Sequence, residues 1–187
     1  MATKIYIDQG HNPENPNAGA EGNGLQEQTI TYNVGQELAS LLRANPDFEV
    51  RLSRPTPTTS LGTSNATSLQ ARVNDANAWG ADYFISIHTN ASDNSNATGV
   101  EAFAYSRPSR AFSLGEDIVD NLSATTGLRN RGMKTRPGLY VLRRTDMPAV
   151  LVEIGFISNP MDAALMNSNP ALFARGIYNG IVEFVGD

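Results

Sequence analysis

Three side chains that can bind a metal or transfer a proton follow the ends of predicted strands. His11 lies three residues beyond the first of these strands, His88 directly follows the third, and Glu153 closes the last. His11 and His88 are the only two histidines of the chain. In an open α/β sheet the ligand-binding crevice lies outside the carboxyl ends of the strands. If these strands are parallel neighbours, the three side chains therefore meet at one edge of the sheet.

Glu27 adds a carboxylate near the start of a helix predicted over about 25–44. It lies three residues before Ile30, which places it on the apolar stripe of that helix. A carboxylate in the first turn also gains from the helix dipole, so its position alone is compatible with a purely structural role. Burial of an unpaired carboxylate is costly, however, and a cation shared with His11 and His88 would neutralise it.

Two histidines and one glutamate, with a fourth position open, form the ligand set of a catalytic zinc site. Zinc lowers the pKa of its bound water to about 7, and a further carboxylate is then needed to accept and return a proton. Glu153 is predicted to be that carboxylate. A single histidine or glutamate at a strand end is more often structural, but two histidines at one sheet edge favour a functional site.

The alternation of apolar runs predicts an α/β fold. We expect a single domain over residues 1–187, with a mostly parallel, mixed central sheet of about six strands and helices on both faces. The predicted strands are 4–8, 48–53, 83–87, 100–105, 139–142 and 149–154. The predicted helices are about 25–44, 69–80 and 109–124, with two more after Asn159-Pro160 and Asn169-Pro170. Asn23, with Gln26 three residues later, is expected to cap the first helix.

Composition excludes several classes of protein. Hydrophobic residues make up 40% of the chain and charged residues 18%, which is typical of a soluble globular domain. There is no cysteine, so only His, Asp or Glu could hold a metal. The net charge of -5 argues against a nucleic-acid partner. No apolar run approaches the roughly 20 residues of a membrane span, and the first residues show no signal-peptide pattern.

Four ordered motifs resemble a known enzyme family. They are IDQGH with His11, GNGLQEQ with Glu27, ARVNDANAWGADYFISIHTNAS with His88, and MPAVLVEIGFISNPMD with Glu153, the last preceded by RNRGMKTRPGLYVLRRT. In this order they resemble the zinc-dependent N-acetylmuramoyl-L-alanine amidases of sporulation lysins, phage endolysins and bacterial cell-division amidases. The similarity runs nearly from end to end.

The resemblance implies one zinc ion held by His11, Glu27 and His88, with Glu153 as catalytic acid and base. The implied reaction is hydrolysis of the amide between N-acetylmuramic acid and L-alanine in peptidoglycan. Two positions depart from the family pattern, because Gln9 stands where proline is usual and Asn12 where glycine is usual. Both flank the first ligand without replacing it, so they affect the expected loop geometry rather than the metal site.

Other polar residues have competing interpretations. Asn90 could hydrogen-bond the substrate, although asparagine is equally common in turns. A basic stretch in a predicted loop could meet the carboxylates of a stem peptide, although such stretches are more often simply solvated. Its members are Arg129, Arg131, Lys134 and Arg136. For Arg72, near the apolar face of its helix, an internal ion pair is expected rather than a substrate contact.

Two other functions remain compatible with the residues. The same ligands could serve a zinc carboxypeptidase or endopeptidase acting on stem peptides, and the fold could be a non-catalytic wall-binding domain. Without a signal-peptide pattern, we expect synthesis in the cytoplasm and action at the wall after release, as for a phage endolysin or a mother-cell lysin. A trimmed form of an exported enzyme would look the same. A wall-binding module, if one exists, is expected to be separate from this chain.

Overall fold

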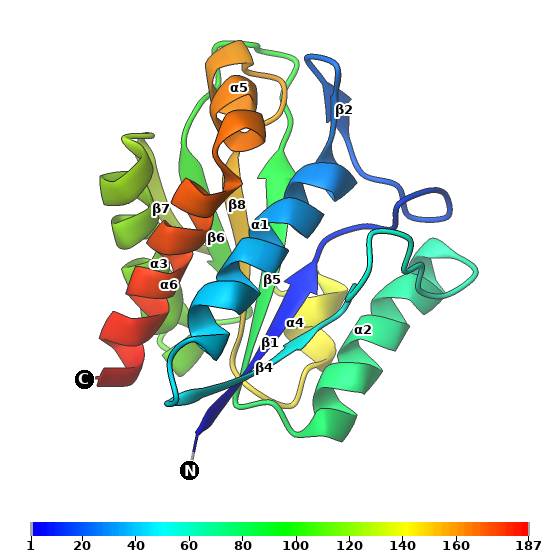
Figure 1. Ribbon diagram of the computed structural model, residues 1–187, viewed down its shortest axis with the longest axis vertical. Helices are drawn as coiled ribbons and strands as arrows, with labels where there is room; N and C mark the ends of the chain where they lie inside the picture. Colours follow the sequence, from blue (N-terminus) through cyan, green and yellow to red (C-terminus); the bar gives the residue numbers. More distant parts are fainter. Residues whose placement is uncertain (1, 187) are drawn as a thin grey trace.

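A computed structural model of the protein describes residues 2–186 and shows one six-stranded sheet with helices on both faces (Figure 1). The spatial order of the strands is β4-β1-β5-β8-β6-β7. In that order they span Phe48–Leu52, Thr3–Gln9, Tyr83–Asn90, Ala149–Phe156, Val100–Ala104 and Asn130–Thr135. The first four are parallel, whereas β6 runs antiparallel to β8 and parallel to β7. The predicted mixed, mostly parallel sheet is confirmed.

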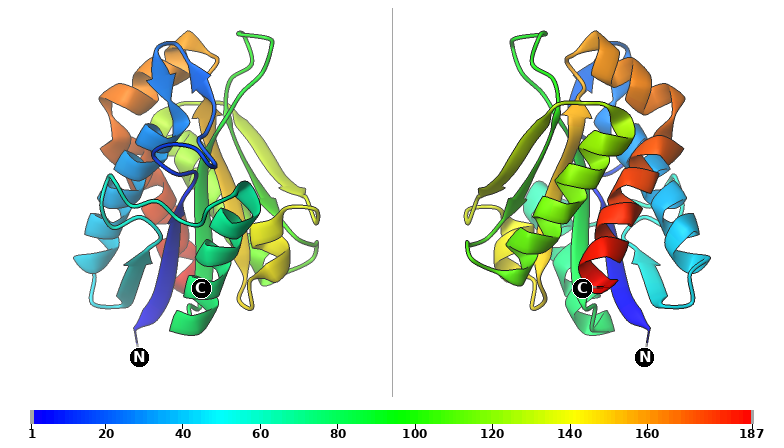
Figure 2. Two further views of the ribbon diagram at one scale, coloured as in Figure 1. Left: turned by 90° about the vertical axis from the view of Figure 1, so that its right-hand side faces the viewer. Right: turned by 90° about the vertical axis from the view of Figure 1, so that its left-hand side faces the viewer.

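Within residues 2–186, six helices cover the two faces of this sheet (Figure 2). They are α1 Glu27–Arg43, α2 Asn65–Trp79, α3 Arg110–Thr126, α4 Tyr140–Arg144, α5 Pro160–Ser168 and α6 Pro170–Gly186. Residues of α1, α3 and α6 pack on one face, and residues of α2 and α4 pack on the other. Among the helices of residues 2–186, none combines the length and apolar character that a membrane span requires.

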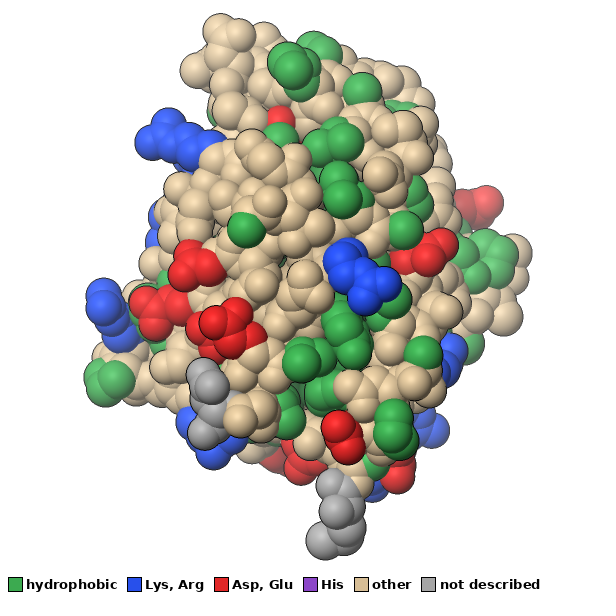
Figure 3. Space-filling view, turned by 60° about the vertical axis from the view of Figure 1, so that its left-hand side comes forward, with side chains coloured by type: hydrophobic (Ala, Val, Ile, Leu, Met, Phe, Trp, Pro, Cys, Tyr) green, Lys and Arg blue, Asp and Glu red, His purple; other side chains and the backbone are tan. Residues whose placement is uncertain are grey.

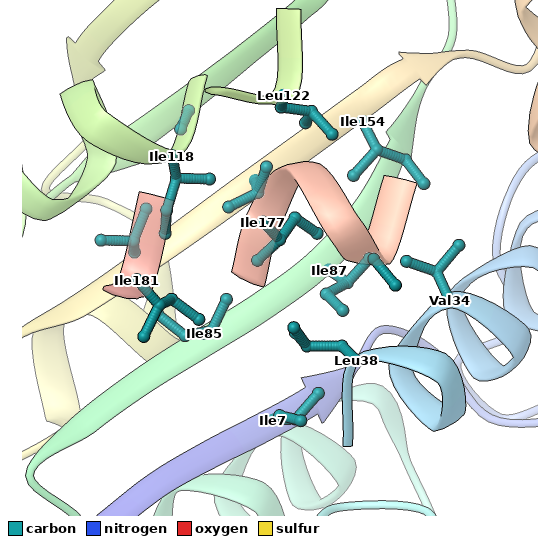
Figure 4. Close-up of a cluster of buried hydrophobic side chains, with 14 of the residues drawn as sticks. Ile7, Val34, Leu38, Ile85, Ile87, Ile118, Leu122, Ile154, Ile177 and Ile181 are labelled. Atoms are coloured by element: carbon teal, nitrogen blue, oxygen red, sulfur yellow. The ribbon is translucent and has the colours of Figure 1, made fainter. Parts of the chain in front are cut away.

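The larger hydrophobic core lies beneath α1, α3 and α6 (Figure 4). Ile7, Ile85 and Ile87 point from the sheet toward Leu38 and Ile177 of the covering helices, and all five are fully buried. The intervening residues of β1 and β5 are buried on the opposite face, because both faces of these central strands are covered. On the α2 side the ring of Tyr6 stacks on Phe84, with centroids 5.4 Å apart.

The outer surface over the larger core carries no histidine. In the space-filling view of Figure 3, acidic, basic and hydrophobic side chains are interspersed over that face, and no histidine side chain is visible on it. Both histidines belong instead to the end of the sheet where β1, β5 and β8 terminate.

The start of the first helix differs from the prediction. Asn23 does not cap it: Asn23 and Gly24 form the turn of a small hairpin, with φ angles of 52° and 74°. Its strands are β2 Glu21–Gly22 and β3 Leu25–Gln26, and α1 begins only at Glu27. Positive φ at both central residues defines a type I′ turn, for which Asn-Gly is the preferred pair. The apolar Leu25 that suggested a longer helix belongs to this hairpin.

Two further segments were assigned wrongly from sequence. Residues 139–142, predicted as a strand, fall at the start of helix α4, which buries Val141 and Leu142 and exposes its arginines. Four apolar residues are too few to distinguish a strand from a helical turn. Of the basic stretch predicted as a loop, Arg131 and Lys134 lie on the edge strand β7, and Arg129 and Arg136 flank it. Met133 is the hydrophobic residue of β7 that packs against the core. An edge strand with one solvated face needs few apolar residues, so the polar composition of this segment did not indicate a strand.

Candidate metal and catalytic site

The loop after β1 turns sharply to present His11. His11 has a φ of 70°, and Gly10 before it lies against His88 of the neighbouring strand. A Cβ atom at Gly10 would lie 2.5 Å from Cε1 of His88, so only glycine fits at this position. The Nδ1 atom of His11 lies 3.2 Å from Oδ1 of Asn17, which fixes the orientation of the ring.

Glu27 stands between the two histidines at the first residue of α1. Its Oε2 lies 3.2 Å from Nε2 of His11, and its Oε1 lies 3.2 Å from Nδ1 of His88. The backbone N–H groups of Ala20 and Thr89 each donate to one of these oxygens at 2.9 Å. The carboxylate is therefore held on one side by the loop after β1 and on the other by the end of strand β5.

The electrostatics of this group follow from these contacts. Burial opposes ionisation of Glu27, but hydrogen bonds from His11 and His88 outweigh it and hold the pKa of its carboxyl far below the usual range. Burial likewise opposes protonation of His88, yet the hydrogen bond and charge of Glu27 outweigh it and raise the pKa of the imidazole. Without a metal, the Glu27 carboxylate and the His88 imidazole thus stabilise each other's charge.

His11, Glu27 and His88 form a cluster suited to a metal ion, as the sequence predicted for their positions. One ligand atom from each lies within 4.8 Å of the other two. The two imidazole rings meet edge to face, with centroids 4.9 Å apart. Two nitrogens and one carboxylate oxygen are donors that zinc accepts, and there is no cysteine to compete.

Glu153 lies directly beside this cluster. On β8 it is the register partner of His88 on β5, and by strand alternation both side chains point to the α2 side of the sheet. Its Oε2 is buried and has no hydrogen-bond partner among the described residues. Burial raises the pKa of its carboxyl to about 7, and the charges of Glu27 and Glu101 add to the rise. The carboxyl can therefore exchange a proton near neutral pH.

Glu101 is a site residue that the sequence analysis missed. It lies opposite Glu153 on the neighbouring strand β6, and its side chain is buried. Asn90 donates to its Oε1 at 2.7 Å, while Lys134 and Arg131 pair with its Oε2, the latter at 3.6 Å from Nε. The available signal was a charged residue inside the otherwise apolar run 100–104.

Asn90 and the basic stretch thus meet at Glu101. Both ends of the Asn90 amide have partners, since its Oδ1 also accepts from the N–H of Ala91 at 2.9 Å. The substrate-binding role predicted for Asn90 stays a prediction. Two members of the basic stretch, Arg131 and Lys134, are not simply solvated, because they neutralise a buried carboxylate.

The predicted internal ion pair of Arg72 is confirmed. Its Nη1 lies 2.7 Å from Oδ1 of Asp8, and both side chains are 1% exposed. Arg72 also donates to the backbone carbonyl oxygens of Gln9 and His11, at 2.6 and 2.7 Å. Burial opposes ionisation of Asp8, but the charge and hydrogen bonds of Arg72 outweigh it and lower the pKa of that carboxyl. This pair holds the loop that carries the first histidine.

The two positions that depart from the family pattern also support this loop. The side chain of Asn12 donates to the carbonyl oxygens of Pro16 and Leu61 and accepts from the N–H of Leu61, at 2.8 to 3.0 Å. Gln9 accepts from the N–H of Arg54 at 2.9 Å and donates to a carbonyl oxygen of α1. Asn12 and Gln9 therefore each form hydrogen bonds that join the His11 loop to neighbouring segments.

Comparison with known proteins agrees with this geometry. The profile of the N-acetylmuramoyl-L-alanine amidase family matches residues 5–183. The amidase CwlM of Bacillus licheniformis is 39% identical over 96% of this chain and 68% of its own length. LytC of Bacillus subtilis is 38% identical over 96% of this chain, which spans only 35% of LytC.

Solved structures give the same result. The catalytic domain of the amidase CwlV from Bacillus (Paenibacillus) polymyxa is 31% identical, with a TM-score of 0.85 over 98% of both chains. An N-acetylmuramoyl-L-alanine amidase from Clostridium difficile is 28% identical, with a TM-score of 0.88 over 100% of this chain and 98% of its own. The family is metal-dependent, in keeping with the His-Glu-His cluster. This chain therefore belongs to the N-acetylmuramoyl-L-alanine amidase family.

Proposed function

We propose that the chain hydrolyses the amide between N-acetylmuramic acid and L-alanine in peptidoglycan with one zinc ion held by His11, Glu27 and His88. We assign Glu153 as the group that moves the proton. The observation that carries this proposal is the adjacency of a three-residue ligand cluster and a buried carboxyl oxygen that has no partner. A buried polar atom normally has a hydrogen-bond partner, so this oxygen indicates a site that a substrate or solvent molecule completes.

The residues fit zinc by donor type and by spacing. Tetrahedral ligands at 2.0–2.1 Å from zinc lie roughly 3.3 Å from one another. Each histidine has a ring nitrogen 3.2 Å from one of the two oxygens of Glu27, and one ligand atom from each of the three residues lies within 4.8 Å of the other two. Zinc must displace the proton that Glu27 favours on His88, so affinity should fall at acidic pH. When bound, zinc would polarise the substrate carbonyl and lower the pKa of a water molecule.

Glu153 supplies the proton transfer that amide hydrolysis requires. With a pKa of about 7, its carboxyl is partly ionised at neutral pH and can accept a proton from the attacking water at its unpartnered oxygen. The same carboxyl can return the proton to the nitrogen of L-alanine as the amide bond breaks. Glu101 on one side and His88 on the other fix its position on the sheet.

The relatives also suggest where the chain acts. They include an endolysin of Bacillus phage SPP1 and a sporulation-specific amidase of Bacillus subtilis. We propose that this chain likewise acts on the cell wall. Because its net charge of -5 provides no general attraction to an anionic wall, we further propose that a separate wall-binding module would increase its activity there.

Product analysis on purified sacculi tests the proposed reaction. The protein would be incubated with sacculi after loading with zinc, and again after treatment with a chelator. We expect new L-alanine amino termini with zinc and none with chelator. New D-amino-acid or diaminopimelate termini would instead show a peptidase, and wall binding with neither product would show a non-catalytic domain.

A further inference from the structure

We infer that the edge strand β7, together with Arg136 directly after it, binds the free carboxylate of the second stem-peptide residue, and that the enzyme therefore prefers stem peptides in which this carboxylate is not amidated. The inference rests on the proposed amidase function and assigns a substrate-binding role to Arg131, Lys134 and Arg136. In the stem peptide, the residue after L-alanine is a γ-linked D-glutamate, whose α-carboxyl occurs either free or as the amide.

The three cations lie on one side of the catalytic carboxyl. Phe103 of β6 is the register partner of Lys134, and the charged ends of Lys134 and Arg136 lie 6.0 and 5.4 Å from the centre of its ring. Phe103 belongs to the hydrophobic cluster on the α2 face, the face to which Glu153 points. Arg136 also lies close enough to Glu153 for its charge to lower the pKa of that carboxyl, against the rise that burial causes.

The cluster retains positive charge after its internal pairing. Glu101 is the one carboxylate that pairs with Arg131 and Lys134, and no ion pair within residues 2–186 includes Arg136. The side chain of Lys134 is 44% exposed and that of Arg131 31%, so both can reach a ligand. Arg131 is held over the ring of Phe156 at 5.1 Å, and its Nη1 donates to a backbone carbonyl oxygen. Arg131 is thus held in place by contacts within the protein.

The side of the site away from β7 carries acidic rather than basic side chains. A cavity of about 540 Å³ is lined by Glu21, Ala91, Ser92, Asp93 and Ser158. One of its lining residues, Glu21, directly follows Ala20, whose N–H donates to the carboxylate of Glu27. This side would repel a carboxylate, whereas β7 would attract one. The charges therefore favour one direction for the peptide, from Glu153 across β6 toward β7.

The dimensions agree with this direction. Neighbouring strands lie about 4.8 Å apart, so β7 lies roughly 10 Å from β8. An extended peptide advances at most about 3.6 Å per residue, which places the second carboxyl roughly 7 Å beyond the cleaved amide. The long side chains of β7 cover the remaining distance. A bound carboxylate would accept hydrogen bonds from a guanidinium or ammonium group, which are stronger than those from neutral donors.

Two disaccharide peptides that differ only at this carboxyl test the inference. One carries D-isoglutamate after L-alanine and the other D-isoglutamine, and the zinc-loaded protein is assayed on each for kcat/KM. We expect about tenfold higher kcat/KM on the acid, expressed mainly in KM, and a smaller ratio at high salt. Arg136→Gln should lower kcat/KM on the acid several-fold more than on the amide. Lys134→Gln should act in the same direction.

Arg175→Gln is the matched control, because Arg175 is exposed on α6, across the sheet from the site. It should leave the preference unchanged, and thermal unfolding of each variant would show that the fold is retained. Equal kcat/KM on both peptides, or equal losses on both in Arg136→Gln, would overturn the inference while leaving the amidase function intact. Failure to cleave sacculi as well as both peptides would remove the proposed function and the inference with it.

Discussion

On the sheet face toward α1, α3 and α6, the central strands present an almost continuous apolar surface, whereas on the face toward α2 and α4 strands β5 and β8 change from apolar to polar toward their carboxyl ends. Along β5, for example, Ile85 and Ile87 enter the larger core, while Phe84, Ser86 and His88 follow one another on the other face. Along β8, Leu151 is followed by Glu153 in the same way.

This difference explains how one sheet provides both stability and a reactive site. Residues two apart in a strand share a face, so a single strand can anchor the core with one set and build the site with the other. The α2 face becomes polar toward the ends of the parallel strands, where ligands bind in open α/β sheets. The helical cover of the first face stabilises the strands that fix His88 and Glu153.

The buried ion pair at the polar end of β1 should show the largest effect on stability. Arg72→Met leaves Asp8 as an uncompensated buried charge, which we expect to cost about 3–5 kcal/mol in the free energy of unfolding. The matched control is Arg51→Met, which breaks an ion pair with Asp75 whose side chains are about 45% exposed. It should cost no more than about 1 kcal/mol in urea unfolding. Equal costs would show that the Asp8 pair does not hold this end of the sheet.

The apolar face should affect stability without affecting catalysis. Ile177 of α6 is fully buried in the larger core, and its replacement by alanine should cost about 2–5 kcal/mol. Because the sheet separates it from the site, kcat of the folded variant should remain that of the wild type. Urea unfolding and an assay at low temperature would measure both quantities. A large fall in kcat at unchanged folded fraction would contradict the separation of the two faces.

Ionisation of Glu153 should lower the free energy of unfolding in a pH-dependent way. Its pKa is about 7 in the folded protein against an ordinary 4.5, so the folded state favours the protonated form. Stability is therefore unaffected below about pH 4.5 and falls as pH rises through 7. In the metal-free protein, Glu153→Gln should be more stable than the wild type at pH 8, and this advantage should vanish near pH 4.5.

Chemical unfolding at the two pH values measures this difference. Glu37→Gln is a suitable control, since Glu37 is exposed on α1 and its replacement should change stability little at either pH. An advantage of Glu153→Gln that is the same at both pH values would show that ionisation of this carboxyl is not opposed by its surroundings.

The hairpin before α1 should show the smallest effect. Gly24 has a φ of 74°, and an alanine there should cost about 1 kcal/mol in the free energy of unfolding. Gly138 offers a comparison, because a Cβ atom there would meet no neighbour and its φ is not positive. Gly138→Ala should be neutral or slightly stabilising in the same unfolding experiment. If both variants behave alike, the left-handed turn does not constrain this hairpin.

The sequence predicted most of the fold because strong local signals coincide. Buried parallel strands appear as short apolar runs, and Asn159 before Pro160 marks a helix start that the structure confirms through hydrogen bonds to the N–H groups of Met161 and Asp162. The predictions that were wrong concern short segments and residues that fit two different structures. Leu25 fits both a helical stripe and a two-residue strand, and Asn23 is as suitable for a type I′ turn as for a cap.

For the site, the position of each residue in its strand was predictable and its partners were not. His11, His88 and Glu153 could be placed at one edge from strand ends alone. Glu101 could not, because β6 runs in the opposite direction and brings the start of its strand to that edge. Only the three-dimensional order of strands shows that Lys134 and Arg131 reach the same carboxylate.

The rate at which zinc-loaded Glu153→Gln releases L-alanine amino termini from sacculi tests the central claim most directly, with bound zinc measured in the same sample. We expect one zinc ion per chain, as in the wild type, and a rate lower by about 10²–10⁴-fold, because the proton acceptor is lost while the ligands remain. A variant that binds zinc and releases L-alanine termini at the wild-type rate would contradict the assignment of Glu153.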